Sequence, residues 1–290
     1  MSIVKGVVVF LVHAGIFGLL LAAGLRSKIR DLAQPGGVLV RALLVIEVAV
    51  PLVAMLAVAL FRVPEAGTAL FLIAAVCPGA PFIVRTTEKG GGRASLALTL
   101  LVITSLAAPL AIPIWIWLMG RFYGFGASIA PLAVAKVVLP SVIVPLALGM
   151  LGRRFVPRLA DRVVPWLDRF FKVVLVVVVP LLLVLGGRVL FHTRPATFAA
   201  ALVIVLVSTA LGAWAGGPAA EDRVAVSVAA VNGNPALAML VFTAVFPDLR
   251  AAAMLSAYII LRAVVSLLYV RLFTRRRRDA PAPREARGTA

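Results

Sequence analysis

The sequence has few charged, sulfur-containing or imidazole side chains. Of its 290 residues only 14% are charged, whereas a typical soluble domain has about 25%. The single cysteine, Cys77, excludes an intrachain disulfide framework and a cysteine-based zinc site. The two histidines, His13 and His192, do not form an H-E-x-x-H motif, and no aspartate lies in the interior of an apolar block. We therefore expect no catalytic residues, no resident metal or organic cofactor, and no enzyme activity.

Long apolar blocks dominate the chain instead. Hydrophobic residues make up 63% of it, and the mean hydropathy is +1.11. A helix needs about 20 mainly apolar residues to cross a hydrocarbon core about 30 Å thick. Cutting the sequence at charged or Gly/Pro-rich interruptions gives nine such spans, at residues 3–24, 38–61, 66–86, 94–119, 129–151, 170–190, 196–217, 222–246 and 249–273. The sequence therefore predicts an all-α, polytopic membrane protein with about nine transmembrane helices over residues 1–273, followed by a disordered basic tail over residues 274–290.

The basic side chains give these predicted helices a direction. The formal net charge is +18, and with the N-terminus outside, 21 of the 29 Lys and Arg residues fall in cytoplasmic segments. The outer segments hold six, namely Lys5, Arg62, Arg121, Arg188, Arg194 and Arg250. Because cytoplasmic loops are enriched in Lys and Arg, this asymmetry predicts an outer N-terminus and a cytoplasmic C-terminus in the cell (inner) membrane. The expected partners are the lipid bilayer and a small-molecule solute, without nucleic acid, and the oligomeric state stays open.

Two of the spans contain a cluster of helix-breaking residues. The third span reads A-V-C-P-G-A-P over residues 75–81, and the eighth reads V-N-G-N-P-A over residues 231–236. Proline removes a backbone donor, and Gly and Asn tolerate non-helical dihedral angles, so both segments are expected to unwind. Unwound backbone at membrane depth must be buried in protein or line a cavity. A single break of this kind favours a kink without function, whereas two breaks at matching positions favour a site.

The matching positions predict an inverted repeat. One break is in the third of spans one to four and the other in the third of spans six to nine, and an offset of five spans reverses the orientation of the second copy. Two such halves, about residues 3–119 and 129–273, are the arrangement in which discontinuous helices form the substrate site of secondary transporters. The predicted site residues are Cys77, Pro78, Gly79 and Pro81 on one wall and Asn232, Gly233, Asn234 and Pro235 on the other.

Glu47, Lys136 and Arg262 are ionisable residues inside apolar blocks. Glu47 is central in its span, where a carboxylate is costly unless it is paired, bound to an ion or protonated. Cation coordination, a proton relay and a neutral Glu bonded to a neighbouring helix all remain open for it. Lys136 is close enough to the outer end of its span to extend its ammonium group into the interface. Arg262 is deeper and needs an acidic or carbonyl partner, for which Glu47 is one candidate.

Several motifs resemble the bile acid:sodium symporter family. They are C-P-G over residues 77–79, followed by G-R-A-S-L-A-L over 92–98, and A-K-V-V-L-P over 135–140 with L-A-L-G over 146–149. Asn232, with A-L-A over 236–238, looks like the second crossover of that family. The resemblance covers nearly the whole chain and implies a nine-helix member with the family's fold and a transporter role.

The resemblance also implies sodium ligands that this sequence has largely replaced. The family's Ser-Asn pair after C-P-G falls on Ile83 and Val84, and its hydroxyl positions in the next span fall on Ala97 and about Leu101. Its Glu and Gln positions before the second crossover fall on Ser227 and Val231, so that only Asn232 matches. Sodium requires several oxygen ligands, which apolar side chains cannot supply. The remaining candidates for ion coupling are Glu47, Ser227 and Asn232.

These observations together favour a secondary transporter that moves a small, anionic and partly apolar organic solute by alternating access. Coupling to protons through Glu47, coupling to sodium (Na+) through an altered site, and no coupling all remain open. A channel or a non-transporting membrane sensor would use similar helix breaks and is the alternative.

Overall fold

The computed structural model describes residues 2–34, 36–77, 79–80, 82–124, 130–192, 194–235, 237–238, 241–242 and 250–279. Every regular element in these residues is a helix, which confirms the all-α class. The elements are α1 (Ser2–Arg26), η1 (Ile29–Leu32), α2 (Gly36–Leu44), η2 (Val45–Ala49), α3 (Val50–Leu60), α4 (Glu65–Ala75), α5 (Ile83–Lys89), α6 (Ala94–Tyr123), α7 (Pro131–Val138), η3 (Leu139–Ile143), α8 (Val144–Phe155), α9 (Pro157–His192), α10 (Pro195–Ala215), α11 (Ala220–Val231) and α13 (Arg250–Asp279).

Four helical stretches in the described residues are long and apolar enough to cross a membrane. They are Gly36–Leu60, Ala94–Tyr123, Leu132–Phe155 and Pro195–Ala215, and two shorter apolar helices cover His13–Arg26 and Glu65–Ala75. The chain is therefore a polytopic membrane protein, while nine spans and an inverted repeat stay predictions. The last helix continues past the predicted boundary at residue 273 to Asp279, since Arg is a good helix former. Residues 280–290 of the predicted tail lie outside the described residues.

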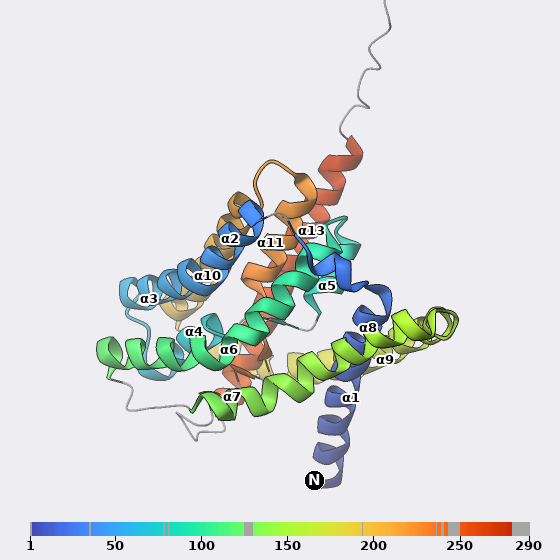
Figure 1. The fold of residues 1–290 in the computed structure, drawn as a ribbon. Coiled ribbons are helices and arrows are strands. Elements are labelled where there is room, and N and C mark those ends of the chain that lie inside the picture. Colours follow the sequence, from blue (N-terminus) through green and yellow to red (C-terminus); the bar gives the residue numbers. More distant parts are fainter. Residues whose placement is uncertain are drawn as a thin grey trace, which may run out of the picture.

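The helices pack in two groups, which Figure 1 shows on either side of α6. In the three-helix group, α1 packs against α8 and α9. In the crossover group, α10 packs against α2, α3 and α11, while α5 and α11 pack against α6. Contacts of α13 with α9 and of α6 with α7 join the groups. The interrupted helices thus belong to one group, and the three-helix group lies beside it.

Glycine allows backbone-to-backbone contact within the three-helix group. A Cβ on Gly24 of α1 would come within 2.3 Å of the Leu146 carbonyl oxygen, and one on Gly149 of α8 within 2.4 Å of the Leu21 carbonyl oxygen. Small residues at such crossings let membrane helices approach closely enough to gain dispersion energy along their length. This contact fixes α1 on α8.

Two long spans contain a π-helical turn, at η2 and at η3. Pro51 follows η2 and has no N–H with which to reach the Glu47 carbonyl four residues earlier. The Val50 N–H bonds to the Val45 carbonyl, five residues back, and the indole Nε1 of Trp115 donates to the Glu47 carbonyl at 2.8 Å. Pro51 thus leaves the Glu47 carbonyl without a helical donor, and Trp115 of α6 supplies one. Such π-turns are frequent at functional sites.

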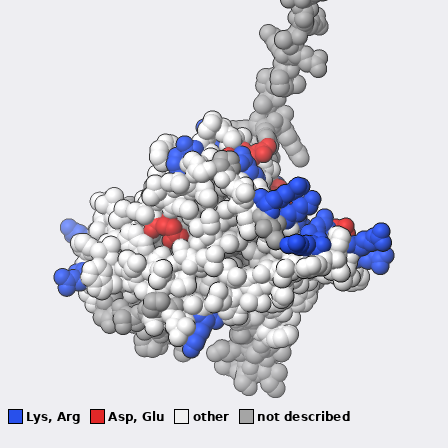
Figure 2. Space-filling view, in the orientation of Figure 1, with Lys and Arg blue, Asp and Glu red and all other residues white. Residues whose placement is uncertain are grey.

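Basic side chains gather at one end of the molecule. Figure 2 shows most of the visible Lys and Arg along its upper and right-hand parts, with smaller basic patches at the left and the bottom and one acidic patch in an otherwise uncharged band. We call the upper and right-hand region the basic end; it includes Arg26, Arg85 and Arg153, which form ion pairs, and Arg41 and Arg223, which line a cavity with Gly217. An uncharged band of this kind is what a helical protein presents to hydrocarbon.

Candidate functional site

The first interruption separates α4 from α5. The last helical bond of α4 runs from the Val76 N–H to the Leu72 carbonyl at 3.2 Å, and Gly79 has a left-handed φ of +82°. L-residues with a side chain rarely adopt this conformation, so glycine is required there. Cys77 is fully buried. The structure therefore unwinds the chain where the sequence predicts a break, although Pro78 and Pro81 lie outside the described residues.

The second interruption follows α11. Asn232 ends that helix in an extended conformation, with φ −103° and ψ 107°. Two residues later Asn234 starts the next helical segment, because its Oδ1 accepts the Leu237 N–H at 3.2 Å and its carbonyl accepts the Ala238 N–H at 3.0 Å. Pro235 follows in the first helical position, where its missing N–H has no partner to lose. Asn234 therefore acts as an N-cap.

The two interruptions touch each other. The Asn234 backbone N–H donates to the Cys77 carbonyl oxygen at 2.7 Å. Gly233 allows this approach, since a Cβ there would lie 2.6 Å from the Cys77 carbonyl oxygen and 3.0 Å from that of Ala74. Segments more than 150 residues apart thus satisfy each other's free backbone groups, as buried unwound chain requires.

Arg262 of α13 lies against this contact. Its side chain is buried, its Nη2 donates to the Ala74 carbonyl at 3.2 Å, and its guanidinium lies 4.7 Å from the centre of the Tyr258 ring. Ala74 is in the last turn of α4, where carbonyls and the helix dipole attract a cation. Of the two kinds of partner that the sequence allowed for Arg262, acidic or carbonyl, the structure shows a carbonyl. No carboxylate of the described residues pairs with Arg262, and its Nε has no hydrogen-bond partner there.

Glu47 lies in the π-turn η2. This turn packs against α10 and α11, in the crossover group. Its Oε1 atom is buried and has no hydrogen-bond partner among the described residues. Arg262 and Glu47 are both near enough to Cys77 to interact with it electrostatically. The Glu47–Arg262 pair that the sequence offered as a candidate is not formed within the described residues, because Arg262 binds the end of α4 instead.

Asn232 and Ser227 are fixed by neighbouring helices. The Asn232 amide Nδ2 donates to the Val228 carbonyl at 2.9 Å and to the Ser266 hydroxyl of α13 at 3.1 Å. The Ser227 hydroxyl donates to the Thr209 carbonyl at 3.0 Å. Ser227 is therefore held between α10 and α11, whereas Asn232 is at the interruption itself. Lys136 is exposed in the second turn of α7, and its position near the membrane interface stays a prediction.

Three buried hydroxyl residues at the interruptions were missed by the sequence analysis. A Cβ on Gly79 would lie 3.0 Å from the Ser105 hydroxyl oxygen and 3.3 Å from that of Thr104, both on α6, and Ser266 contacts Asn232. The resemblance to the family had placed the hydroxyl positions of this helix one to two turns earlier, at Ala97 and about Leu101. For two of them the available signal was the adjacent Thr-Ser pair itself, inside a long apolar helix.

Ion pairs connect neighbouring helices at the basic end. Arg93 and Asp222 form two contacts, at 2.8 and 2.9 Å, and the Arg93 N–H donates to the Glu221 carbonyl at 3.1 Å. This joins the start of α6 to the start of α11. Asp168 of α9 pairs with Arg85 of α5 at 3.2 Å and also with Arg26 of α1. The second set crosses between the two helix groups.

A cavity of about 180 Å³ lies beside this second set of ion pairs. Its lining comes from α1 and the Ser27 that follows it on one side, and from α5 and the start of α6 on the other, and it includes Arg26 and Arg85. The space between the helix groups at the basic end is therefore small, and charges of both signs line it, since Glu88 also lines the cavity and Asp168 pairs with both arginines.

A helical membrane protein in which two interrupted helices meet at a buried, partly polar point has the construction of a membrane transporter. The chain belongs to the sodium bile acid symporter family, whose model (Sodium Bile acid symporter family) matches residues 15–193. The match covers more than half of the chain, including the first interruption. A comparison with curated proteins gives no match. The family makes this chain a membrane transporter of the symporter kind, which is consistent with the expectation that it is not an enzyme.

Proposed function

We propose that this chain is a secondary transporter that moves a small organic anion by alternating access. The observation that carries the proposal is the contact between the interruptions, where the Asn234 N–H meets the Cys77 carbonyl beside a buried arginine. Helix breaks of this kind supply polar backbone to a solute at membrane depth. Each break precedes a long helix, α6 in one case and α13 in the other, which supports the predicted inverted repeat.

Arg262 supports an anionic solute. It is a buried cation without a carboxylate partner in the described residues, and its Nη1 lies next to Gly233 at the second interruption. Guanidinium is always charged in proteins and binds carboxylate, sulfonate or phosphate groups through two parallel hydrogen bonds. An anionic group placed beside Gly233 would therefore complete the coordination of Arg262.

The ion pairs around Asp168 support a movement between the two helix groups. They join α5 of the crossover group to α1 and α9 of the three-helix group, next to the small cavity. In the proposed cycle these pairs open when the solute pathway opens at the basic end and form again when it closes. The N-terminus is proposed to face outside and the basic end the cytoplasm, in the cell membrane.

Protons are the proposed coupling ion, through Glu47. Its buried Oε1 lacks a hydrogen bond in the described residues, which is tolerable when the carboxyl group carries a proton or binds a cation. The helices around η2 have their charged residues at the basic end (Arg41, Glu221, Asp222 and Arg223) and in the last turn of α6 (Arg121), whose Trp115 bonds to η2, and α3 and α10 have none. A rebuilt sodium site that uses Glu47, Asn232, Ser227 and the hydroxyls of α6 is the competing coupling scheme.

The proposed function is tested in two stages. A thermal-shift screen in detergent with organic carboxylates and sulfonates identifies solutes, because a bound solute stabilises the folded state. Uptake of a radiolabelled hit into proteoliposomes then follows. Saturable uptake that internal unlabelled solute accelerates is the expected result for a carrier. Uptake without such acceleration would indicate a channel, and binding without uptake would indicate a sensor.

A further inference from the structure

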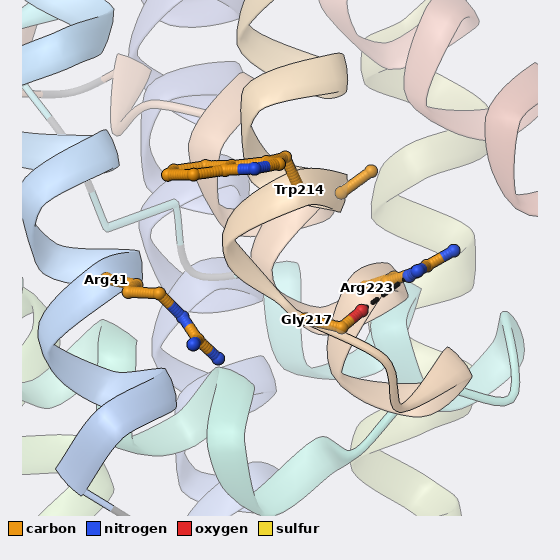
Figure 3. Close-up of a pocket in the computed structure, with 5 residues that line it drawn as sticks. Arg41, Trp214, Gly217 and Arg223 are labelled. Atoms are coloured by element: carbon orange, nitrogen blue, oxygen red, sulfur yellow. Dashed lines mark hydrogen bonds between the residues drawn. The ribbon is translucent and has the colours of Figure 1, made fainter.

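A second site lies at the basic end, on the side of the crossover group that carries α2 and α10. It is a cavity of about 480 Å³ lined by Arg41, Ala213, Trp214, Gly217 and Arg223. Figure 3 shows that Arg41 comes from α2 and Trp214 from the end of α10, while Arg223 comes from the start of α11. Arg223 is in the first turn of α11, whereas the second interruption follows Val231 at the other end of this helix, so the cavity is separate from the contact between the interruptions.

The two arginines are held in place by the end of α10. Arg41 Nε donates to the Ala215 carbonyl at 3.2 Å, and Arg223 Nε donates to the Gly217 carbonyl at 2.5 Å. Gly217 has a φ of +74°, and a Cβ there would lie 2.8 Å from Arg41 Nη2. Both guanidinium groups therefore contact one glycine, which no larger residue could replace without displacing Arg41.

These arginines keep free charge and free donors. The Nε of each arginine donates to a carbonyl. The terminal nitrogens of each planar guanidinium group form no hydrogen bond within the described residues and can therefore bind an anion. Neither is paired with a carboxylate within the part of the chain that the structure describes, and the nearby Asp222 is bound to Arg93. The cavity therefore offers two positive charges to an anionic group.

An apolar surface leads away from the arginines. The Trp214 side chain is 70% exposed, and Val207, two turns earlier on the same face of α10, is also exposed. On α2 the exposed residues Val40 and Leu44 lie on either side of Arg41 in sequence. Exposed tryptophan is typical of the membrane interface, and basic pockets between helices on the cytoplasmic side bind the head groups of anionic lipids.

We propose that Arg41, Arg223 and Trp214 form a binding site for an anionic glycerophospholipid, whose phosphate contacts both arginines and whose acyl chains lie along α2 and α10. The apolar surface decides between a lipid and a free phosphate ion, because a soluble anion would gain nothing from it. The lipid would hold together the last turn of α2, the end of α10 and the start of α11, and α11 leads to the second interruption.

Trp214 provides the reporter for a direct test. The protein is reconstituted in vesicles that contain either brominated phosphatidylglycerol or brominated phosphatidylcholine, since bromine quenches a tryptophan in contact with it. The difference between the unaltered protein and its Trp214→Phe variant isolates the signal from Trp214. We expect phosphatidylglycerol to be preferred, and Arg41→Gln or Arg223→Gln to weaken this preference about fivefold each. Arg121→Gln is the matched control, since Arg121 is exposed at the far end of α6.

Each result of this test is decisive. Equal quenching by the two lipids, or a preference that persists in Arg41→Gln and Arg223→Gln, would overturn the lipid site. Inorganic phosphate is added in a parallel sample whose ionic strength is matched with chloride. If phosphate abolishes the preference and chloride does not, the site binds soluble anions and the lipid proposal is wrong. Arg41→Lys, which keeps the charge, should retain most of the preference, and a loss as large as in Arg41→Gln would contradict the electrostatic basis.

Discussion

At the scale of single residues, Asn234 has two separable roles. Its backbone N–H joins the interruptions, and its side chain caps the helical segment that follows. Asn234→Ala removes only the cap, so we expect a loss of about 1 kcal/mol in the free energy of unfolding and reduced uptake at similar expression. Asn234→Asp keeps the capping oxygen and is the control. Thermal unfolding and proteoliposome uptake measure both effects, and normal uptake in Asn234→Ala would remove the cap from the site.

Glu47 gives a second prediction at this scale. Glu47→Gln mimics the protonated carboxyl group, so we expect it to fold normally and to lose the dependence of uptake on pH. In the unaltered protein, replacing sodium by choline at fixed pH should leave uptake unchanged. Uptake that disappears in choline and shows a flat pH profile would instead support the competing sodium site.

Residue types alone identified some of the site but not its contacts. Pro, Gly and Asn in an apolar span are informative because they act on the backbone locally. The partner of Arg262 and the positions of Thr104 and Ser105 depend on which helix faces are adjacent, and a single sequence does not contain that information. The structure places Thr104 and Ser105 beside Gly79, and the resemblance to the family had not suggested these positions.

At the scale of helices, the glycine contact between α1 and α8 makes a prediction about stability. Gly149→Ala would place a methyl group 2.4 Å from the Leu21 carbonyl oxygen, so the helices must separate. We expect a loss of about 1–3 kcal/mol in the free energy of unfolding, measured by thermal unfolding in detergent. Gly37→Ala is the matched control, because no atom lies within 4 Å of its Cβ position and alanine favours the helix. Equal stability of the two variants would contradict close packing at Gly149.

Helix existence was easier to predict than helix limits. The apolar blocks gave the long helices, but α9 begins at Pro157, well before its predicted span at residue 170. Charged residues in that segment suggested a loop, whereas an exposed helix carries them equally well. The π-turn η2 was not predicted, because it follows from Pro51 together with a donor from another helix, Trp115.

At the scale of the whole molecule, the sole cysteine reports access to the site. Cys77 is fully buried while Asp168 joins the helix groups. Asp168→Asn removes the shared partner of Arg26 and Arg85, so the closed arrangement loses ion-pair energy of about 1 kcal/mol. We expect Cys77 to react several-fold faster with a maleimide added at the basic end. Asp161→Asn is the control, because Asp161 pairs with Arg153 inside the three-helix group. Identical reaction rates in both variants would contradict the proposal that the Asp168 ion pairs close the pathway at the basic end.

The buried charge of Arg262 has a consequence for the response to membrane voltage. In the proposed cycle, the carrier returns empty with Glu47 deprotonated, so the charges of Glu47 and Arg262 cancel, and a carrier loaded with a proton and a monovalent anion is neutral as well. Moving one elementary charge through 100 mV changes the free energy by about 2.3 kcal/mol, and a partial path changes it in proportion. Both reorientation steps would then be electrically silent, whereas a carrier that holds the proton without the anion would carry one net positive charge. Transient currents in the absence of solute would thus be confined to low pH, where Glu47 of the empty carrier is protonated.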